Sequence, residues 1–235
     1  MKNFFITGTD TDVGKTFVTC ALIEAFAKRG LRAAPMKPVA AGTVNINGVN
    51  INPDVAALRE VSRSKAALRD SNPYCFSEPI APHLAARHEN TALQMHVIRA
   101  AFDRLNADAD TVLVEGAGGF LVPLSVSQSM AEIPAALSLD VVLVVGMRLG
   151  VLNHALLTVE AIGARKLALA GWVANTPVMG EAMLAFDENL ATLQRMIDAP
   201  LLGTVPFDAL SNSTIERARR ASAYLQIDSL TKAIL

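Results

Sequence analysis

A glycine-rich segment near the start of the chain has the residues and spacing needed to bind a nucleotide phosphate. Gly8–Thr16, with the sequence GTDTDVGKT, follows a short apolar run and precedes a segment of helical period. In such a loop the backbone N–H groups and the helix N-terminus converge on the β- and γ-phosphates. Lys15 would add a positive charge, and the hydroxyl of Thr16 could coordinate Mg²⁺. Gly14 lies six positions after Gly8, one more than in the common pattern, so a chance Gly-Lys-Thr is the alternative.

A second charged group, Glu115, ends the apolar run Val112-Leu113-Val114. This is where a nucleotide-binding protein of this kind places an acid near Mg²⁺. Ligands of open α/β sheets bind at the carboxyl ends of the strands, so Glu115 would face the same crevice as the phosphate loop. The run Gly116-Ala117-Gly118-Gly119 follows and allows close approach of a backbone to a ligand. It is not a dinucleotide fingerprint, because Leu121 stands where the third glycine is required. A solvated acid at a strand end is the alternative.

Two further residues could serve the same site but also have simpler explanations. Lys37 ends a short strand candidate and precedes Pro38, so its ammonium would project from a strand end. From spacing alone, an ordinary surface lysine is the favoured interpretation of Lys37. Asp54 opens a helical segment after Gly42–Asn52, and a role as helix N-cap would account for it.

A parallel sheet covered by helices would position these residues. Short apolar runs alternate along the chain with longer segments of helical period. Thr111–Val114 and Val141–Val145 lack polar alternation, so we expect central strands buried on both faces. The other expected strands are Asn3–Thr7, Arg32–Met36, Leu167–Ala174 and Leu201–Val205. The expected helices are Lys15–Arg29, Thr91–Ala107, Met130–Leu137, Val151–Gly163 and Glu181–Ile197. Gly42–Asn52 is predicted to be a functional loop.

The predicted fold class is therefore α/β. We expect residues 1–235 to form a single P-loop nucleotide-binding domain, with a mostly parallel central sheet flanked by helices. Hydrophobic residues make up 51% of the chain, which excludes disorder of the whole. The net charge of −1 gives no basic surplus for nucleic acid or anionic lipid. Without a signal-peptide pattern or an apolar run long enough for a membrane span, the expected location is the cytoplasm.

Together these residues resemble one family, the dethiobiotin synthetases. The resemblance runs in order along all but about the last 25 residues, and an ordered series of matches is more specific than any one motif. The matching stretches are Gly8–Thr16, Lys37–Gly42, Asn72–Tyr74, Ala81–His83, Val112–Gly119, Val144–His154, Ala170–Asn175 and Pro200–Pro206. The resemblance implies an ATP-dependent cyclo-ligase of biotin biosynthesis. 7,8-Diaminopelargonic acid takes up CO₂ as a carbamate, ATP phosphorylates the carbamate, and the second amine closes the ureido ring of dethiobiotin.

The resemblance also implies a role for each site residue. Lys15 and Lys37 would neutralise the γ-phosphate and the carbamate, while Thr16, Asp54 and Glu115 would hold Mg²⁺ through oxygen ligands. Asn175 would recognise adenine through its amide. The implied ATP-binding residues are Asp12, Val13, Gly14, Lys15, Thr16, Phe17, Asp54, Glu115, Gly116, Ala117, Gly118, Asn175, Val205, Pro206 and Phe207. The implied substrate-binding residues are Thr11, Lys37, Ala41, Gly150, Val151, Leu152 and Asn153, the last four reaching across a homodimer to the substrate carboxylate.

The chain also departs from the family pattern. Ala41 stands where a serine is common, which removes one substrate hydrogen bond worth about 1 kcal/mol. Arg148 stands where a lysine is frequent, and the residues after Pro206 differ from the pattern.

Three other functions compete with this one. An amide-forming ligase of the cobyrinic-acid type would need a glutamine-hydrolysing domain, for which there is no room. A partitioning-type ATPase switch would carry an extra lysine where Asp10 stands. A catalytically dead ATP-binding module would not need both lysines and the three Mg²⁺ ligands.

Overall fold

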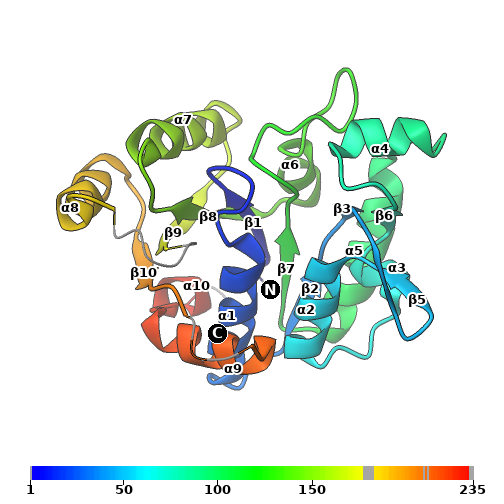
Figure 1. Ribbon diagram of the computed structural model, residues 1–235, viewed down its shortest axis with the longest axis horizontal. Coiled ribbons are helices and arrows are strands. Elements are labelled where there is room, and N and C mark those ends of the chain that lie inside the picture. The colour runs from blue at the N-terminus through cyan, green and yellow to red at the C-terminus, as the bar shows by residue number, and fades with distance from the viewer. Residues whose placement is uncertain (1, 177–182, 209, 211, 233–235) are drawn as a thin grey trace.

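The core of the molecule is a six-stranded parallel sheet with the strand order β10-β9-β8-β1-β7-β2 (Figure 1). The computed structural model describes residues 2–176, 183–208, 210 and 212–232. The strands are β1 (Phe4–Gly8), β2 (Ala33–Met36), β7 (Thr111–Glu115), β8 (Asp140–Gly146), β9 (Leu169–Asn175) and β10 (Leu201–Val205). Each of the six expected strands is therefore confirmed, with small differences at the ends. Pro35 lies in β2, an edge strand, where a missing N–H costs least.

Alternate residues of the strands enter two different hydrophobic cores, because successive side chains of a strand point to opposite faces. Phe4 and Ile6 of β1 pack in the core that contains α1, whereas Phe5 packs in the core that contains α5. In β7, Leu113 joins the first core, and Val112 and Val114 join the second. The expectation that the central strands are buried on both faces is confirmed.

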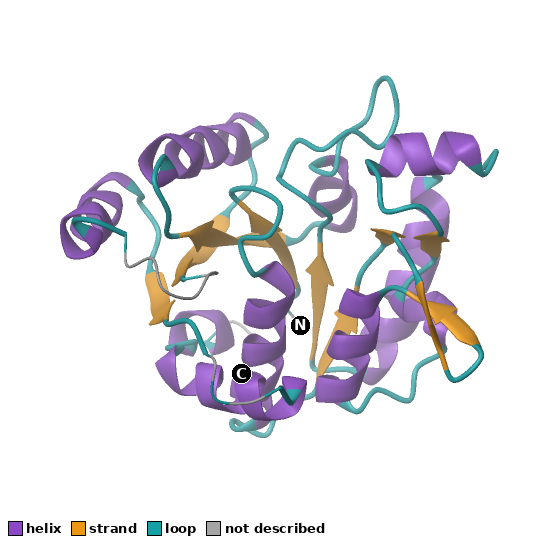
Figure 2. Ribbon diagram, in the orientation of Figure 1, coloured by secondary structure: helices purple, strands orange, loops and turns teal. Residues whose placement is uncertain are grey.

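Helices cover both faces of the sheet (Figure 2). One face carries α1 (Lys15–Ala27), α2 (Pro53–Ser62), α9 (Thr214–Ala221) and α10 (Asp228–Thr231). The other carries α4 (Pro82–His88), α5 (Met95–Asp108), α6 (Glu132–Leu137), α7 (Val151–Ala164) and α8 (Phe186–Met196). The short α3 (Leu68–Ser71) packs on α5. Among the described residues, no helix is long and apolar enough to cross a membrane.

The structure corrects several of the expected boundaries. The helix expected over Thr91–Ala107 begins at Met95, and the one expected over Met130–Leu137 begins at Glu132. The helix expected over Glu181–Ile197 begins at Phe186 within the described residues; residues 181 and 182 lie outside them. A small parallel sheet of β3 (Val39–Ala41) and β6 (Tyr74–Phe76) was not expected from the sequence.

The segment Gly42–Asn52 is a β-hairpin rather than the loop expected from its composition. Its strands are β4 (Val44–Ile46) and β5 (Val49–Ile51), which pair antiparallel. Asn47 and Gly48 form the turn, with φ of 52° and 82°. Asn-Gly is the preferred pair for a two-residue hairpin turn, because both residues adopt positive φ at low cost.

Candidate functional site

The segment between β1 and α1 has the form of a phosphate-binding loop. Gly14 is the N-cap of α1 and has φ of 85°, in the left-handed region that favours glycine. A Cβ on Gly14 would lie 2.2 Å from Nδ2 of Asn175, so the loop packs against the end of β9 only if this residue is glycine. The first backbone N–H groups of α1 are therefore placed to face an anion, since the first turn of a helix leaves them without helical partners.

Lys15, the first residue of α1, is 7% exposed. Its Nζ donates a hydrogen bond to the carbonyl oxygen of Asp10 (2.9 Å). Burial lowers the pKa of Lys15; the charge of Glu115 opposes this effect, and that of Lys37 adds to it. Within the described residues no carboxylate lies in ion-pair distance of Lys15. A bound phosphate would supply the opposite charge that this ammonium lacks.

Lys37 follows β2 and joins two acids from different parts of the chain. Its Nζ donates to Oδ2 of Asp54 and to Oε1 of Glu115, both at 2.7 Å. Lys37 is 5% exposed and Glu115 is fully buried. The interpretations of Lys37 as a surface lysine and of Glu115 as a solvated acid are therefore wrong, because β2 and β7 are neighbours and end side by side.

The two acids shift the protonation equilibria of this cluster. Burial acts to lower the pKa of Lys37, but the charges of Glu115 and Asp54 outweigh it, so the pKa lies above the ordinary value. For Asp54, burial acts to raise the pKa; the charge and hydrogen bond of Lys37 outweigh it, and the pKa lies below the ordinary value. The net shifts therefore favour a charged Lys37 and a charged Asp54 at neutral pH.

Asp54 is not the N-cap of α2. That position belongs to Asn52, whose side-chain oxygen accepts hydrogen bonds from the N–H groups of Asp54 (3.1 Å) and Val55 (3.4 Å). The capping interpretation of Asp54 is therefore wrong, and its carboxylate turns toward Lys37 instead. Asn52 also donates to the carbonyl oxygens of Ala41 and Gly42, which ties the hairpin to the site.

Three oxygen-bearing side chains converge beside the phosphate loop: Thr16, Asp54 and Glu115. The hydroxyl of Thr16 donates to Oε1 of Glu115 (2.8 Å). Oε2 of Glu115 is buried and has no hydrogen-bond partner among the described residues. Two carboxylates and a hydroxyl are hard oxygen donors, and this set fits Mg²⁺ with water and phosphate oxygens as the remaining ligands.

A cavity of about 890 Å³ opens in front of these groups. This volume lies in the range of about 300–1,000 Å³ typical of small-molecule sites. Its charged wall comes from the loop and the cluster described above, and its apolar wall from a segment before α4. The lining residues are Thr11, Asp12, Gly14, Lys15, Thr16, Lys37, Ala41, Asn52, Asp54, Pro79, Ile80, Ala81, Pro82, Ala117, Gly118 and Val122.

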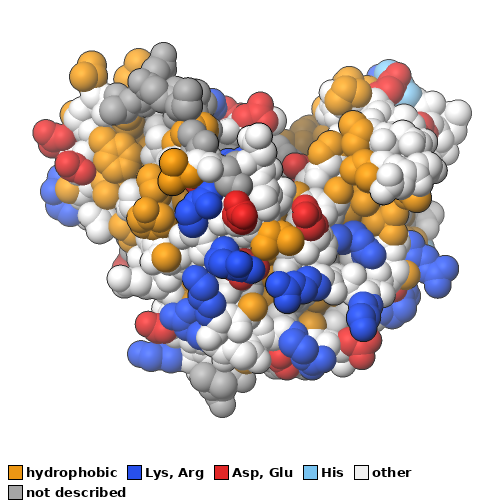
Figure 3. All heavy atoms as spheres, turned by 60° about the horizontal axis from the view of Figure 1, so that its bottom comes forward, with side chains coloured by type: hydrophobic (Ala, Val, Ile, Leu, Met, Phe, Trp, Pro, Cys, Tyr) orange, Lys and Arg blue, Asp and Glu red, His pale blue; other side chains and the backbone are white. Residues whose placement is uncertain are grey.

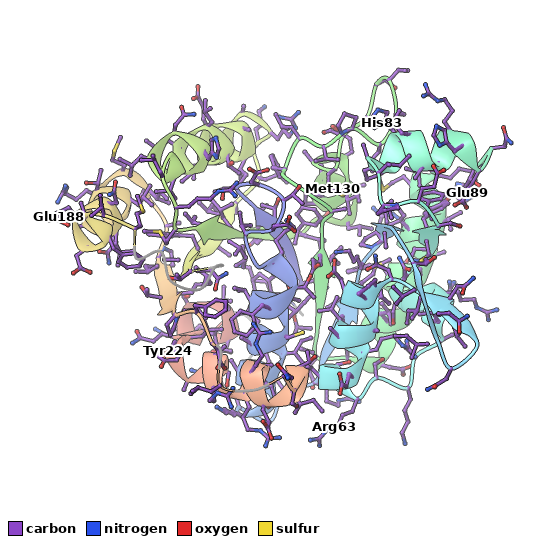
Figure 4. All side chains as sticks on the ribbon, viewed as in Figure 1. Arg63, His83, Glu89, Met130, Glu188 and Tyr224 are labelled. Atoms are coloured by element: carbon purple, nitrogen blue, oxygen red, sulfur yellow. The ribbon has the colours of Figure 1, made fainter. Side chains whose placement is uncertain are left out.

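Gly116 allows the chain after Glu115 to pass close to the core. A Cβ on Gly116 would lie 2.9 Å from Cζ of Phe5 and 3.3 Å from Cγ of Met130. Met130 lies between β7 and α6 (Figure 4). The small residue therefore lets the backbone after β7 turn directly into the wall of the cavity.

Comparison with known proteins identifies the family. The family model described as an AAA domain matches residues 2–214. The ATP-dependent dethiobiotin synthetase BioD of Aromatoleum aromaticum is 54% identical over 87% of this chain and 90% of its own length. The proteins of the same name from Nitrosospira multiformis and Ralstonia nicotianae are 49% and 48% identical, over 88% and 86% of this chain and 89% and 87% of their own lengths. The chain belongs to the dethiobiotin synthetase family.

The fold of this dethiobiotin synthetase family member is shared with more distant ATPases. The cell division ATPase MinD of Pyrococcus furiosus superposes with a TM-score of 0.60, covers 99% of this chain and 100% of its own, and is 16% identical. A ParA family ATPase of Chlorobium tepidum gives 0.54 at 13% identity, covering 99% and 96%. At these identities the likeness concerns the fold alone, and the partitioning-type alternative gains no support beyond it.

The residues expected to bind adenine lie beside the phosphate loop rather than in the large cavity. Asn175 ends β9, is 1% exposed, and donates from Nδ2 to the carbonyl oxygen of Val13 (2.8 Å). Its Oδ1 is buried without a hydrogen-bond partner among the described residues. Val205 pairs with Asn175 in the sheet, and Pro206 and Phe207 follow directly. Phe17 lies on α1 next to Thr16.

The expected substrate residues divide into two groups. Thr11, Lys37 and Ala41 line the large cavity. Gly150–Asn153, at the start of α7, do not line it. Gly150 is the N-cap of α7, with φ of 91°.

Several cavity residues had no predicted role. Asn52 and Pro79–Pro82 belong to this set. Asn52-Pro53 is a sequence signal for a helix start, because asparagine is a good N-cap and proline suits the first helical position. That signal could have located Asn52; we find no comparable signal for Ile80.

Proposed function

We propose that this chain closes the ureido ring of dethiobiotin from 7,8-diaminopelargonic acid and CO₂ with ATP. The observation that carries the proposal is the buried ammonium of Lys37 at the wall of a ligand-sized cavity, next to the phosphate loop. Sequence identity of 48–54% to ATP-dependent dethiobiotin synthetases supports the same reaction.

The reaction brings two anions together, and the two lysines suit that task. One amine of the diamine attacks CO₂ and loses a proton to give a carbamate. A carbamate oxygen then attacks the γ-phosphorus of ATP, and ADP leaves. The second amine attacks the carbamoyl carbon, loses its proton and releases phosphate. Lys15 and Lys37 would stabilise the charge that gathers between carbamate and γ-phosphate, since cations placed in advance lower the cost of that charge.

We also propose that Thr16, Asp54 and Glu115 hold Mg²⁺ with the nucleotide. The ion would neutralise charge on the transferred phosphoryl group. The support is the donor set itself and the buried, unpartnered Oε2 of Glu115. Asn175 and residues 205–207 would contact adenine, and their place at the ends of adjacent strands β9 and β10 supports this role.

A homodimer would complete the substrate site. Leu149 and Leu157 on or beside α7 are 95% and 56% exposed, and Leu121 opposite them is 49% exposed. A second cavity of about 460 Å³ lies between α7 and residues 119–123. Such exposed leucines around a hollow are typical of an interface, and Gly150–Asn153 would then face a partner's site. The Leu157→Glu variant should elute as a monomer and lose affinity for the diamine while still binding ATP; a Leu157→Glu dimer with normal kinetics would oppose the proposal.

Phosphate release from ATP with Mg²⁺ and bicarbonate tests the proposed reaction, with dethiobiotin followed by mass spectrometry. Phosphate and dethiobiotin should appear together, in equal amounts, and only when 7,8-diaminopelargonic acid is present. ATP hydrolysis that does not respond to the diamine would contradict the proposal and favour an ATPase switch.

A further inference from the structure

A third, smaller cavity lies on the other side of Thr16, between α1, α2 and α9. Its volume is about 190 Å³, and it is lined by Thr16, Phe17, Cys20, Ala57, Thr214 and Arg217. This is below the range of about 300–1,000 Å³ for a whole ligand, so the cavity can take only one part of a larger molecule. Thr16 also lines the large cavity, which makes the two cavities neighbours along the phosphate loop.

Arg217 is the charged residue of this cavity. It projects from α9, and its guanidinium carbon lies 4.9 Å from the centroid of the Phe17 ring. Stacking of this kind fixes a planar guanidinium in place. Arg217 therefore reaches α1 at the residue that directly follows Thr16.

The guanidinium has hydrogen-bonding capacity to spare. Nε of Arg217 is buried and has no hydrogen-bond partner among the described residues. Among the described residues Arg217 forms no ion pair; the nearby Asp208, on which the charge of Arg217 also acts, pairs with Arg220 at 2.6 Å. A buried N–H without a partner is costly, and an anion at this position would satisfy it.

The order of the phosphates along the loop indicates which anion. In a loop of this kind the lysine reaches the β- and γ-phosphates and the Thr hydroxyl reaches Mg²⁺, so the next N–H of the helix lies toward the α-phosphate. Phe17 occupies that next position, and Arg217 stacks on it. Lys and Arg side chains outnumber the Asp and Glu side chains that lie among them across the middle of the face shown in Figure 3.

We propose that Arg217 binds the α-phosphate of the nucleotide held by the phosphate loop. This inference rests on the proposed use of ATP, but not on the identity of the second substrate. α9 would thereby become part of the nucleotide site, although it lies in the part of the chain that carries none of the motifs of the family resemblance.

Calorimetric titration of Arg217→Ala with ADP and with ATP tests the inference. Both nucleotides carry the α-phosphate, so both should bind about tenfold more weakly, the loss of one charge-assisted hydrogen bond. In steady-state assays the KM for ATP should rise by a similar factor, with kcat and the KM for the diamine nearly unchanged. Arg219→Ala, which removes the same charge from an exposed position of α9, should bind both nucleotides normally.

Thermal unfolding without nucleotide separates binding from packing. If Arg217 only pins α9 to α1, Arg217→Ala will unfold at a lower temperature and bind ADP as the wild type does, which would overturn the inference. A loss confined to ATP would overturn it as well. If Arg217→Ala does not fold, Arg217→Lys replaces it in the test, because lysine keeps the charge but not the planar stacking. Arg217→Lys should bind ADP more weakly than the wild type. Normal ADP affinity and normal stability of Arg217→Lys would contradict a contact that requires the guanidinium.

The same titrations distinguish this inference from the proposed reaction. A wild-type protein that makes no dethiobiotin, but binds ADP through Arg217, would contradict the reaction and leave the inference standing. If the wild-type protein makes dethiobiotin but Arg217→Ala binds ADP with unchanged affinity, the proposed reaction stands and the inference about Arg217 is wrong.

Discussion

Replacing Glu115 with glutamine should expose how strongly the buried lysine depends on its partner. Oε1 of Glu115 accepts hydrogen bonds from Lys37 (2.7 Å) and Thr16 (2.8 Å). Glu115→Gln keeps the shape of the side chain but removes its charge. Burial, the largest effect on Lys37, acts to lower its pKa, and the charge of Glu115 is the strongest effect that opposes it.

The expected cost is about 3 kcal/mol in the free energy of unfolding at pH 7. Removing one partner of a buried ion pair costs about 3–5 kcal/mol. We expect the lower end of this range for Glu115→Gln, because Asp54 still pairs with Lys37. For a chain of this length, about 3 kcal/mol corresponds to a fall of about 6–12 °C in Tm.

The cost should also shrink as the pH rises. In the wild type the pKa of Lys37 is above the ordinary 10.5, so its contribution to stability is complete below pH 10.5 and is lost as the pH rises through the raised value. In Glu115→Gln the pKa of Lys37 should lie below its wild-type value, because the strongest opposing charge is gone while burial remains. Lys37 of the variant then loses its charge at a lower pH than in the wild type. The difference in stability between the two proteins should therefore shrink as the pH rises toward the wild-type pKa of Lys37.

Guanidinium unfolding followed by Trp172 fluorescence measures this difference. Trp172 is the single tryptophan of the chain and is fully buried. The measurements are made with EDTA and without nucleotide, so that neither metal binding nor nucleotide binding contributes to the measured stability. The double variant Glu115→Gln/Lys37→Met should recover much of the lost stability, because neither buried group is then charged. Equal stability of Glu115→Gln and wild type at pH 7, or a difference that does not change with pH, would refute the reasoning.

Three further predictions concern the loop and the charged cluster. Lys37→Ala should bind ATP with nearly unchanged affinity and lose turnover, since the role proposed for Lys37 is to stabilise developing charge; near-wild-type kcat in a steady-state assay would contradict this role. Gly14→Ala should weaken ATP binding at least about tenfold in calorimetry, or about 1.4 kcal/mol, because its Cβ would lie 2.2 Å from the Asn175 amide. The pKa of Asp54 is below its ordinary 3.8, so its pairing stabilises the fold above that pH and is lost as the pH falls through the lower value. Asp54→Asn should then be less stable than wild type at pH 7, and the difference should narrow as the pH falls below 3.8. A difference in urea unfolding that does not change with pH would contradict this.

The sheet could be predicted from the sequence because its strands carry local signals. β7 and β8 are unbroken runs of β-branched and apolar residues, as strands buried on both faces require. The hairpin over Gly42–Asn52 was missed although Asn47-Gly48 is a strong turn signal. The short strands β3 and β6 carry little local signal, because three residues cannot show a period.

Lys15, Thr16 and Glu115 could be singled out from the sequence one by one, but the arrangement in which they meet Lys37 could not. Spacing alone favoured a surface position for Lys37, since nothing nearby in sequence indicates a partner 78 residues away. Its burial depends on β2 lying beside β7, which only the strand order decides. Spacing alone favours an N-cap role for Asp54, because it stands at the start of a helix, but Asn52 precedes the proline and is the cap. Arg217 carried no signal at all, because its contact with Phe17 joins opposite ends of the chain.

The adjacency of β1, β7 and β2 has a consequence for how this protein tolerates mutation. Main-chain hydrogen bonds, which do not depend on side-chain identity, hold β1, β7 and β2 at a fixed spacing. Glu115 ends β7, Lys37 directly follows β2, and the phosphate loop follows β1. Substitutions in the hydrophobic cores on both faces of the sheet should therefore lower the temperature at which the protein unfolds before they alter the affinity of the site. Residues of the interior can therefore be exchanged while the geometry of the site is retained.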